Sequence, residues 1–151
     1  MDIVLLKPQI PQNTGSIART CAATQTSLHI IGPTPFEISD KTTRRTGLDY
    51  WPYVNLSKHE LWEDYLDTRR PQNIWLLTKF ASRIYYNAAF SVNDAIVFGS
   101  ETTGLGRDFL ALFPENQKLL IPMPCSNVRS LNLSNAVSIV LYEALRQVNS
   151  K

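Results

Sequence analysis

Short, largely apolar runs recur along the chain, and polar or helical segments separate them. Apolar runs of this length, bounded by Gly, Pro and polar residues, are typical of strands that are buried on both faces. Strands that alternate with helical segments indicate a parallel sheet with helices on both faces. The sequence therefore predicts an α/β fold, with a further strand at Tyr53–Leu56. The predicted runs are Ile3–Leu6, Leu28–Ile31, Ile74–Thr78, Ala95–Gly99 and Leu119–Ile121.

Helical patterns occupy the segments between several of these runs. The strongest lies at Leu133–Val148, where apolar residues recur at three- and four-residue spacing. A helix is expected to begin near Asn13, a residue type that often caps helices. Ser57 and Glu60 have the spacing of a capping box, which predicts another helix directly after them. A short helix is expected at Phe109–Phe113, before Pro114.

Length and composition indicate one domain, residues 1–151, because 44% of the residues are hydrophobic and only 19% are charged. The chain has no apolar run long enough for a membrane span, and its first residues do not resemble a signal peptide. We therefore expect a cytoplasmic protein without membrane contact. Two cysteines are too few for a framework of disulfide bonds. His29 and His59 are expected to lie far apart, so no metal site is predicted. A net charge of +2 excludes no class of partner.

Three unusual loops follow predicted strands, and ligands of parallel α/β sheets bind at the carboxyl ends of strands. They are PQIPQNTGSIART after the first strand, GSETTGLG after the fifth and PMPCSNVRSLN after the sixth. GSETTGLG lacks the Gly-Lys-Ser/Thr ending of a phosphate loop and the spaced glycines of a dinucleotide fold. Its Glu101 would suit a ribose or a cationic ligand. Taken alone, a strand followed by a glycine-containing loop is more often an ordinary α/β turn than a binding site.

The polar residues of the other two loops also allow two interpretations. Arg19 lies on the predicted polar side of the first helix, where it is either a solvated side chain or a group that binds phosphate or stabilises negative charge on oxygen. Asn132 and its Ser- and Asn-rich neighbours either cap the last helix or present groups that read a purine edge.

A basic and aromatic stretch follows the second strand, and it is expected to hold a short helix before Gly47. Its cations and aromatic rings could hold phosphates and stack on bases, or the rings could pack against the protein while the charges are solvated. The residues are Lys41, Arg44, Arg45, Tyr50, Trp51 and Tyr53.

Taken together and in this order, the three loops resemble the motifs of SPOUT-class RNA 2′-O-methyltransferases. The resemblance covers the whole chain. More specifically, the chain resembles the single-domain family that methylates the wobble ribose of certain tRNAs (the TrmL/YibK family). The matching segments are PQIPQNTGSIART, VFGSETTGLG and IPMPCSNVRSLNLSNAVSIVLYEALRQ, with LHIIGP and RRTGLDYW between them. The loop between Met123 and Arg129 is about one residue longer than the resemblance leads us to expect, which leaves the contacts of Cys125–Asn127 open.

The resemblance implies a fold whose C-terminal part is tied in a trefoil knot, which general rules of chain topology would have rejected. It implies S-adenosylmethionine as methyl donor, S-adenosylhomocysteine as product, no metal, a homodimer, and the anticodon stem-loop of a tRNA, with a leucine tRNA expected, as substrate. Arg19, Asn13 and Asn132 would be catalytic. The cofactor would contact Leu77, Gly99, Glu101, Ile121, Ser130 and Leu131.

Two other functions remain open from the residues alone. A non-catalytic RNA-binding module would use the basic and aromatic stretch and would have no affinity for the cofactor. A small-molecule-binding α/β protein would show no salt-sensitive binding to tRNA, because phosphate contacts make affinity fall with salt.

Overall fold

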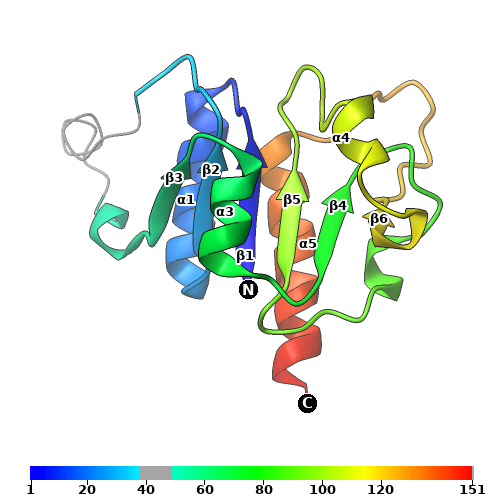
Figure 1. The fold of residues 1–151 in the computed structure, drawn as a ribbon. Coiled ribbons are helices and arrows are strands. Elements are labelled where there is room, and N and C mark those ends of the chain that lie inside the picture. The colour runs from blue at the N-terminus through cyan, green and yellow to red at the C-terminus, as the bar shows by residue number, and fades with distance from the viewer. Residues whose placement is uncertain (38–48, 151) are drawn as a thin grey trace.

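A six-stranded sheet forms the centre of the molecule (Figure 1). The structure, a computed structural model, describes residues 1–37 and 49–150. Every pairing between strands is parallel, and the strand order is β3-β2-β1-β5-β4-β6. The predicted α/β class with a parallel sheet is therefore confirmed. The strands are β1 (Asp2–Leu6), β2 (Ser27–Ile31), β3 (Leu56–His59), β4 (Ile74–Leu77), β5 (Ala95–Phe98) and β6 (Lys118–Leu119).

Helices cover both faces of this sheet (Figure 1). On one face α1 (Pro11–Thr24) packs beside α5 (Leu133–Asn149). On the other face lie α3 (Trp62–Arg69) and α4 (Arg107–Ala111). Among the described residues, no helix combines the length and the apolar character needed to cross a membrane. Short 3-10 turns are at Trp51–Tyr53, Tyr85–Asn87 and Glu115–Gln117.

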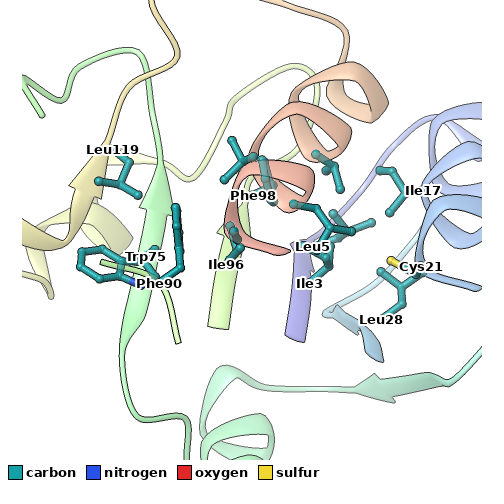
Figure 2. Close-up of a cluster of buried hydrophobic side chains, with 14 of the residues drawn as sticks. Ile3, Leu5, Ile17, Cys21, Leu28, Trp75, Phe90, Ile96, Phe98 and Leu119 are labelled. Atoms are coloured by element: carbon teal, nitrogen blue, oxygen red, sulfur yellow. The ribbon is translucent and has the colours of Figure 1, made fainter. Parts of the chain in front are cut away.

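The central strands are buried on both sides, which explains why their sequences are largely apolar. Ile3 and Leu5 point into the core under α1 and α5, together with Ile17 of α1 (Figure 2). Val4, between them in β1, belongs to the second cluster under α3, with Tyr65. Successive side chains of a strand point to opposite faces, so a strand with a helix layer on each side is apolar at most positions.

The edge strand β3 was placed wrongly from the sequence. Tyr53 belongs to a 3-10 turn around Pro52, in which its N–H donates to the Tyr50 carbonyl at 3.0 Å. The strand itself runs over Leu56–His59 and pairs only with β2. Its residues are half-buried or exposed, so it carries no apolar run by which to find it.

Two predicted helix starts were also wrong. Ser57 lies in β3, and α3 begins at Trp62, where the Asp64 carboxylate accepts the N–H of Leu61 at 2.9 Å. Asn13 does not cap α1, because that helix already begins at Pro11, whose fixed φ and missing N–H suit the first turn. The Asn13 side chain is left to bond elsewhere, as described below.

The predicted short helix in the basic stretch before Gly47 lies outside the described residues. The helix near Phe109–Phe113 is confirmed as α4, Arg107–Ala111, and the last helix is confirmed as α5. Asn132 caps α5, so one member of the Ser- and Asn-rich cluster has the capping role expected of it.

A buried polar cluster joins β1, β2, β3 and α3. The expectation that His29 and His59 lie far apart is wrong, because the neighbouring strands β2 and β3 bring His29 Nδ1 within 3.0 Å of His59 Nε2. Asp2 accepts the Tyr65 hydroxyl at 3.1 Å and two Arg69 N–H groups at 2.9 and 2.8 Å. His29 Nε2 faces Asp2 Oδ2 at 3.6 Å.

This cluster predicts a loss of stability in mild acid. Burial lowers the pKa of His29 from 6.5 to about 4, against the opposing attraction of Asp2. Between these two pH values the unfolded chain binds a proton that the folded chain does not, so stability falls as the pH drops through this window, by up to about 3 kcal/mol. Urea unfolding of the wild type and His29→Gln across pH 4–7 measures this. The variant should lose most of the dependence, and parallel pH profiles would contradict the assignment to His29.

Candidate active site

The three loops singled out in the sequence meet at one cavity of about 730 Å³. They follow β1, β5 and β6, and the segment after β4 adds a further part of the wall. The cavity therefore lies at the carboxyl ends of the strands, where parallel sheets bind their ligands. Its volume is in the range of small-molecule sites, roughly 300–1,000 Å³.

Most of the predicted site residues line this cavity, and only Arg19 does not. The lining residues from that set are Asn13, Leu77, Gly99, Glu101, Ile121, Ser130, Leu131 and Asn132. The first loop contributes one of them, the second loop two and the third loop three. Residues more than 100 positions apart in the sequence, such as Asn13 and Asn132, therefore line the same cavity.

A chain of side-chain hydrogen bonds joins the three loops. Asn13 Nδ2 donates to Glu101 Oε1 at 2.9 Å, and Asn132 Nδ2 donates to Asn13 Oδ1 at 2.9 Å. Asn132 Oδ1 in turn accepts the N–H groups of Ser134 at 2.9 Å and Asn135 at 3.3 Å, which caps α5. Each amide donates to one neighbour and accepts from the next, so its orientation is set by the chain. We call this set, Glu101, Asn13 and Asn132, the loop relay.

Glu101 also holds the start of α1. Its carboxylate accepts the backbone N–H of Gln9 at 2.8 Å and of Ile10 at 3.2 Å. Burial alone would raise its pKa, but the hydrogen bonds from Asn13 and from the backbone outweigh burial and keep the pKa below its ordinary value. An ionised carboxylate at a helix N-terminus is also favoured by the helix dipole. Glu101 is therefore a charged anchor between the first and second loops.

The second loop turns back on itself at glycine positions. Ser100 and Gly104 exchange backbone hydrogen bonds of 3.1 and 2.9 Å, and Gly104 has a φ of 63°, which favours glycine. A Cβ added to Gly99 would lie 1.9 Å from the Gly104 carbonyl carbon and 2.1 Å from the Leu105 nitrogen. Glycine at position 99 is thus required by backbone packed against backbone.

Arg19 lies apart from the cavity wall. It is exposed on α1, as predicted, and its guanidinium carbon lies 5.0 Å from the centre of the Tyr50 ring. The Tyr50 hydroxyl donates to the Gly15 carbonyl at 3.0 Å, which fixes that ring on the same helix. The role predicted for Arg19 is not accounted for by contacts within its own chain.

The aromatic residues of the basic and aromatic stretch differ in their exposure, so some are packed against the protein and one is free to contact a ligand. Tyr50 and Trp51 are partly buried against the core, while Tyr53 is exposed. The cations of that stretch, Lys41, Arg44 and Arg45, lie outside the described residues.

Sequence reasoning missed the wall that follows β4. Thr78, Lys79 and Phe80 line the cavity, as does Arg107 at the start of α4. The segment carries no motif, but it follows a predicted parallel strand, so the rule of carboxyl ends would have found it. By contrast, Cys125–Asn127 are exposed and do not line the cavity; a turn closes there, with the Val128 N–H donating to the Cys125 carbonyl at 3.2 Å.

Residues 1–142 match the model of the SpoU rRNA Methylase family. The chain belongs to this family. A tRNA (cytidine(34)-2'-O)-methyltransferase of Escherichia coli (strain K12) is 43% identical over 148 residues, which cover 98% of this chain and 94% of the relative. The family resemblance inferred from the three motifs is thereby confirmed.

Solved structures agree with this membership in the SpoU family. One, from work on the 2-OH methylation of C/U34 on tRNA, has a TM-score of 0.88 at 41% identity and covers 99% of this chain and 97% of its own. Another is the SpoU methyltransferase AviRb of Streptomyces viridochromogenes in complex with the cofactor AdoMet. It has a TM-score of 0.81 at 25% identity, and the alignment covers 100% of this chain and 61% of the AviRb chain. Within residues 1–37 and 49–150, no group of three or more His, Cys, Asp or Glu side chains is placed to hold a metal ion.

The packing of Gly99 in this SpoU chain predicts that Gly99→Ala is destabilising. Because the new methyl group would meet backbone and not a flexible side chain, we expect a loss of about 1–3 kcal/mol in urea unfolding. Gly15→Ala is the matched control, since its Cβ would meet only the Tyr50 hydroxyl at 4.0 Å. In a helix that change should be neutral or stabilise by up to about 1 kcal/mol. Equal stability of Gly99→Ala and wild type would disprove the close approach.

Proposed function

We propose that this protein is an S-adenosylmethionine-dependent tRNA 2′-O-methyltransferase that acts on the ribose of nucleotide 34. The observation that carries the proposal is the single cavity in which the three motif loops meet, in a chain of the SpoU family. The substrate would be the anticodon stem-loop, with cytidine or uridine at position 34 and a leucine tRNA as the first to test. Work on tRNA would place the protein in the cytoplasm.

The cavity suits the cofactor in size and in chemistry. Leu77 and Ile121 offer apolar contacts, Gly99 and Leu131 bring backbone groups close, and the Ser130 hydroxyl can bond polar atoms. Glu101 contributes a negative charge near which a cation is favoured. When bound, S-adenosylmethionine supplies a methyl group on a cationic sulfonium and leaves as S-adenosylhomocysteine.

The path of the chain supports the proposed trefoil knot in the second and third loops. From β4 the chain moves inward to β5, then outward past β4 to β6, since the strand order is β1-β5-β4-β6. It then returns to pack α5 against α1. Two reversals across the same strands are what a knotted C-terminal region requires.

The contacts of the loop relay favour positioning roles for Asn13 and Asn132. The two amides bond to each other, to Glu101 and to the N–H groups at the start of α5, so they hold the loops in register around a ribose. Arg19 is the remaining predicted catalytic residue. A guanidinium is a poor base, so we propose that it binds an RNA phosphate near the hydroxyl or stabilises the charge that develops on its oxygen.

A homodimer would explain why Arg19 lies away from the cavity of its own chain. Ile139 and Tyr142 are exposed three residues apart, hence on one side of α5, which packs beside the helix that carries Arg19. We propose that this surface pairs with a second copy and that the RNA binds at the junction.

The dimer proposal predicts that Tyr142→Glu weakens self-association at least about tenfold, because a charge would replace buried apolar contact at the interface. Sedimentation velocity over a concentration series measures it. Leu61→Glu, an exposed apolar residue at the start of α3 on the opposite face, is the control and should self-associate like the wild type. A monomeric wild type would exclude the dimer.

The enzymatic proposal predicts transfer of label from S-adenosylmethionine to tRNA, with mass mapping of the methyl group to the ribose of nucleotide 34. Arg19→Ala should lose roughly a hundredfold or more in rate, as expected when a group that stabilises the transition state is removed. Arg70→Asn, which removes another exposed guanidinium and suits the left-handed backbone there (φ 48°), should retain the wild-type rate.

The labelling assay, together with calorimetry of cofactor binding, distinguishes the proposed function from two alternatives. Label in ribosomal RNA and none in tRNA would indicate a methyltransferase of another RNA. RNA binding without any calorimetric signal for the cofactor would indicate a non-catalytic RNA-binding module. An unaffected Arg19→Ala variant would remove the role of that residue alone.

A further inference from the structure

A bare aromatic ring stands at the rim of the cavity. Phe80 lines the cavity, yet 75% of its surface is exposed. A large apolar side chain is costly to leave in water, since burying one contributes roughly 1.5–3 kcal/mol. Single exposed apolar residues are common on protein surfaces, so exposure alone does not indicate a function. The position at the mouth of the candidate active site distinguishes this one.

The loop that presents Phe80 is firmly held. The Thr78 N–H donates to the Leu119 carbonyl at 2.9 Å, and the Phe80 N–H donates to the Thr78 hydroxyl oxygen at 3.3 Å. Ala81, directly after Phe80, is buried. Arg83 donates to the carbonyls of Asn116 at 3.0 Å and Asn87 at 2.7 Å and lies over the Trp75 ring. The backbone on both sides of Phe80 is therefore held by hydrogen bonds and burial, so the position of the exposed ring is fixed by its neighbours.

One cation lies beside the ring, and two more line the same cavity. The Lys79 ammonium lies 5.3 Å from the centre of the Phe80 ring, and Arg107 and Arg129 line the same cavity. Within the described residues, none of these three cations forms a salt bridge. An exposed aromatic face beside unpaired cations is the combination with which proteins stack a base and hold the neighbouring phosphates of unpaired RNA.

We propose that Phe80 is the stacking platform for the base of the nucleotide whose ribose is methylated, with Lys79 close to its phosphate. The inference rests on the proposed function and adds the group that positions the target nucleotide. The ring lies at the rim, whereas the half-buried Leu77 and Ile121 provide the inner apolar walls, so the cofactor adenine takes the inner surface and the RNA base the outer one. Every base has a π-face, so this platform accepts cytidine and uridine alike.

The test compares Phe80→Ala, Phe80→Leu and Phe80→Tyr with the wild type in single-turnover methylation of an anticodon stem-loop. Loss of one stacked base corresponds to a fall of roughly five- to hundredfold. We expect that fall in kcat/KM for Phe80→Ala and a similar one for Phe80→Leu, because leucine is apolar but has no π-face. Phe80→Tyr should remain close to the wild type. Leu112→Ala, an exposed apolar residue that does not line the cavity, is the control and should be unaffected.

An RNA with an abasic ribose at the target position separates stacking on that base from any other role. On this RNA the wild type and Phe80→Ala should react at the same rate, because the group that distinguishes them is gone. A persistent difference, full activity of Phe80→Leu, or weaker calorimetric binding of S-adenosylmethionine to Phe80→Ala would each overturn the inference. Failure of the wild type to methylate any RNA would instead overturn the proposed function itself.

Discussion

The carboxylate of Glu101 is the interaction on which the arrangement of the cavity depends. It accepts two backbone N–H groups at the start of α1 and the amide of Asn13, which in turn accepts from Asn132 at the start of α5. One half-buried charge thereby holds three loops that come from the beginning, the middle and the end of the chain. Removing it would leave the two backbone N–H groups at the start of α1 and the amide of Asn13 without their acceptor, and the loss of such partners costs free energy. The walls of the cavity are therefore positioned by polar bonds, while the sheet behind them is held by apolar burial.

The sequence predicted the layers well because burial leaves a strong pattern. β1, β4 and β5 are enclosed on both faces, so their apolar runs mark them, and α5 shows its buried stripe. It failed where the backbone is only half covered or where a local signal competes. β3 at the sheet edge has no such run, and Ser57 within it has the spacing of a helix cap with Glu60, which directly follows the strand. His29 and His59 became neighbours through strand pairing, which no local pattern records.

Most residues of the candidate site could be predicted from the sequence, but the hydrogen bonds that connect its loops could not. Each motif loop follows a strand whose carboxyl end could be predicted, so the membership of most lining residues could be anticipated. The loop relay could not, since it depends on which strands are neighbours and on how α1 starts. Pro11, two positions before Asn13, decides that start and so frees the Asn13 amide for Glu101. The β4 segment with Phe80 carries no recognisable motif, and in the sequence only its place directly after a predicted parallel strand indicates it.

The place of β1 at the centre of the sheet has a consequence for how the chain is made. β1 precedes both of its partners in the chain, and it pairs on one side with β2 and on the other with β5, at Ala95–Phe98. Contacts between such distant segments slow folding, because a long stretch of chain must be closed before they form. During synthesis β1 therefore stays unpaired on one side until residues 95–98 have been made, and the cavity can be assembled only after α5 has followed.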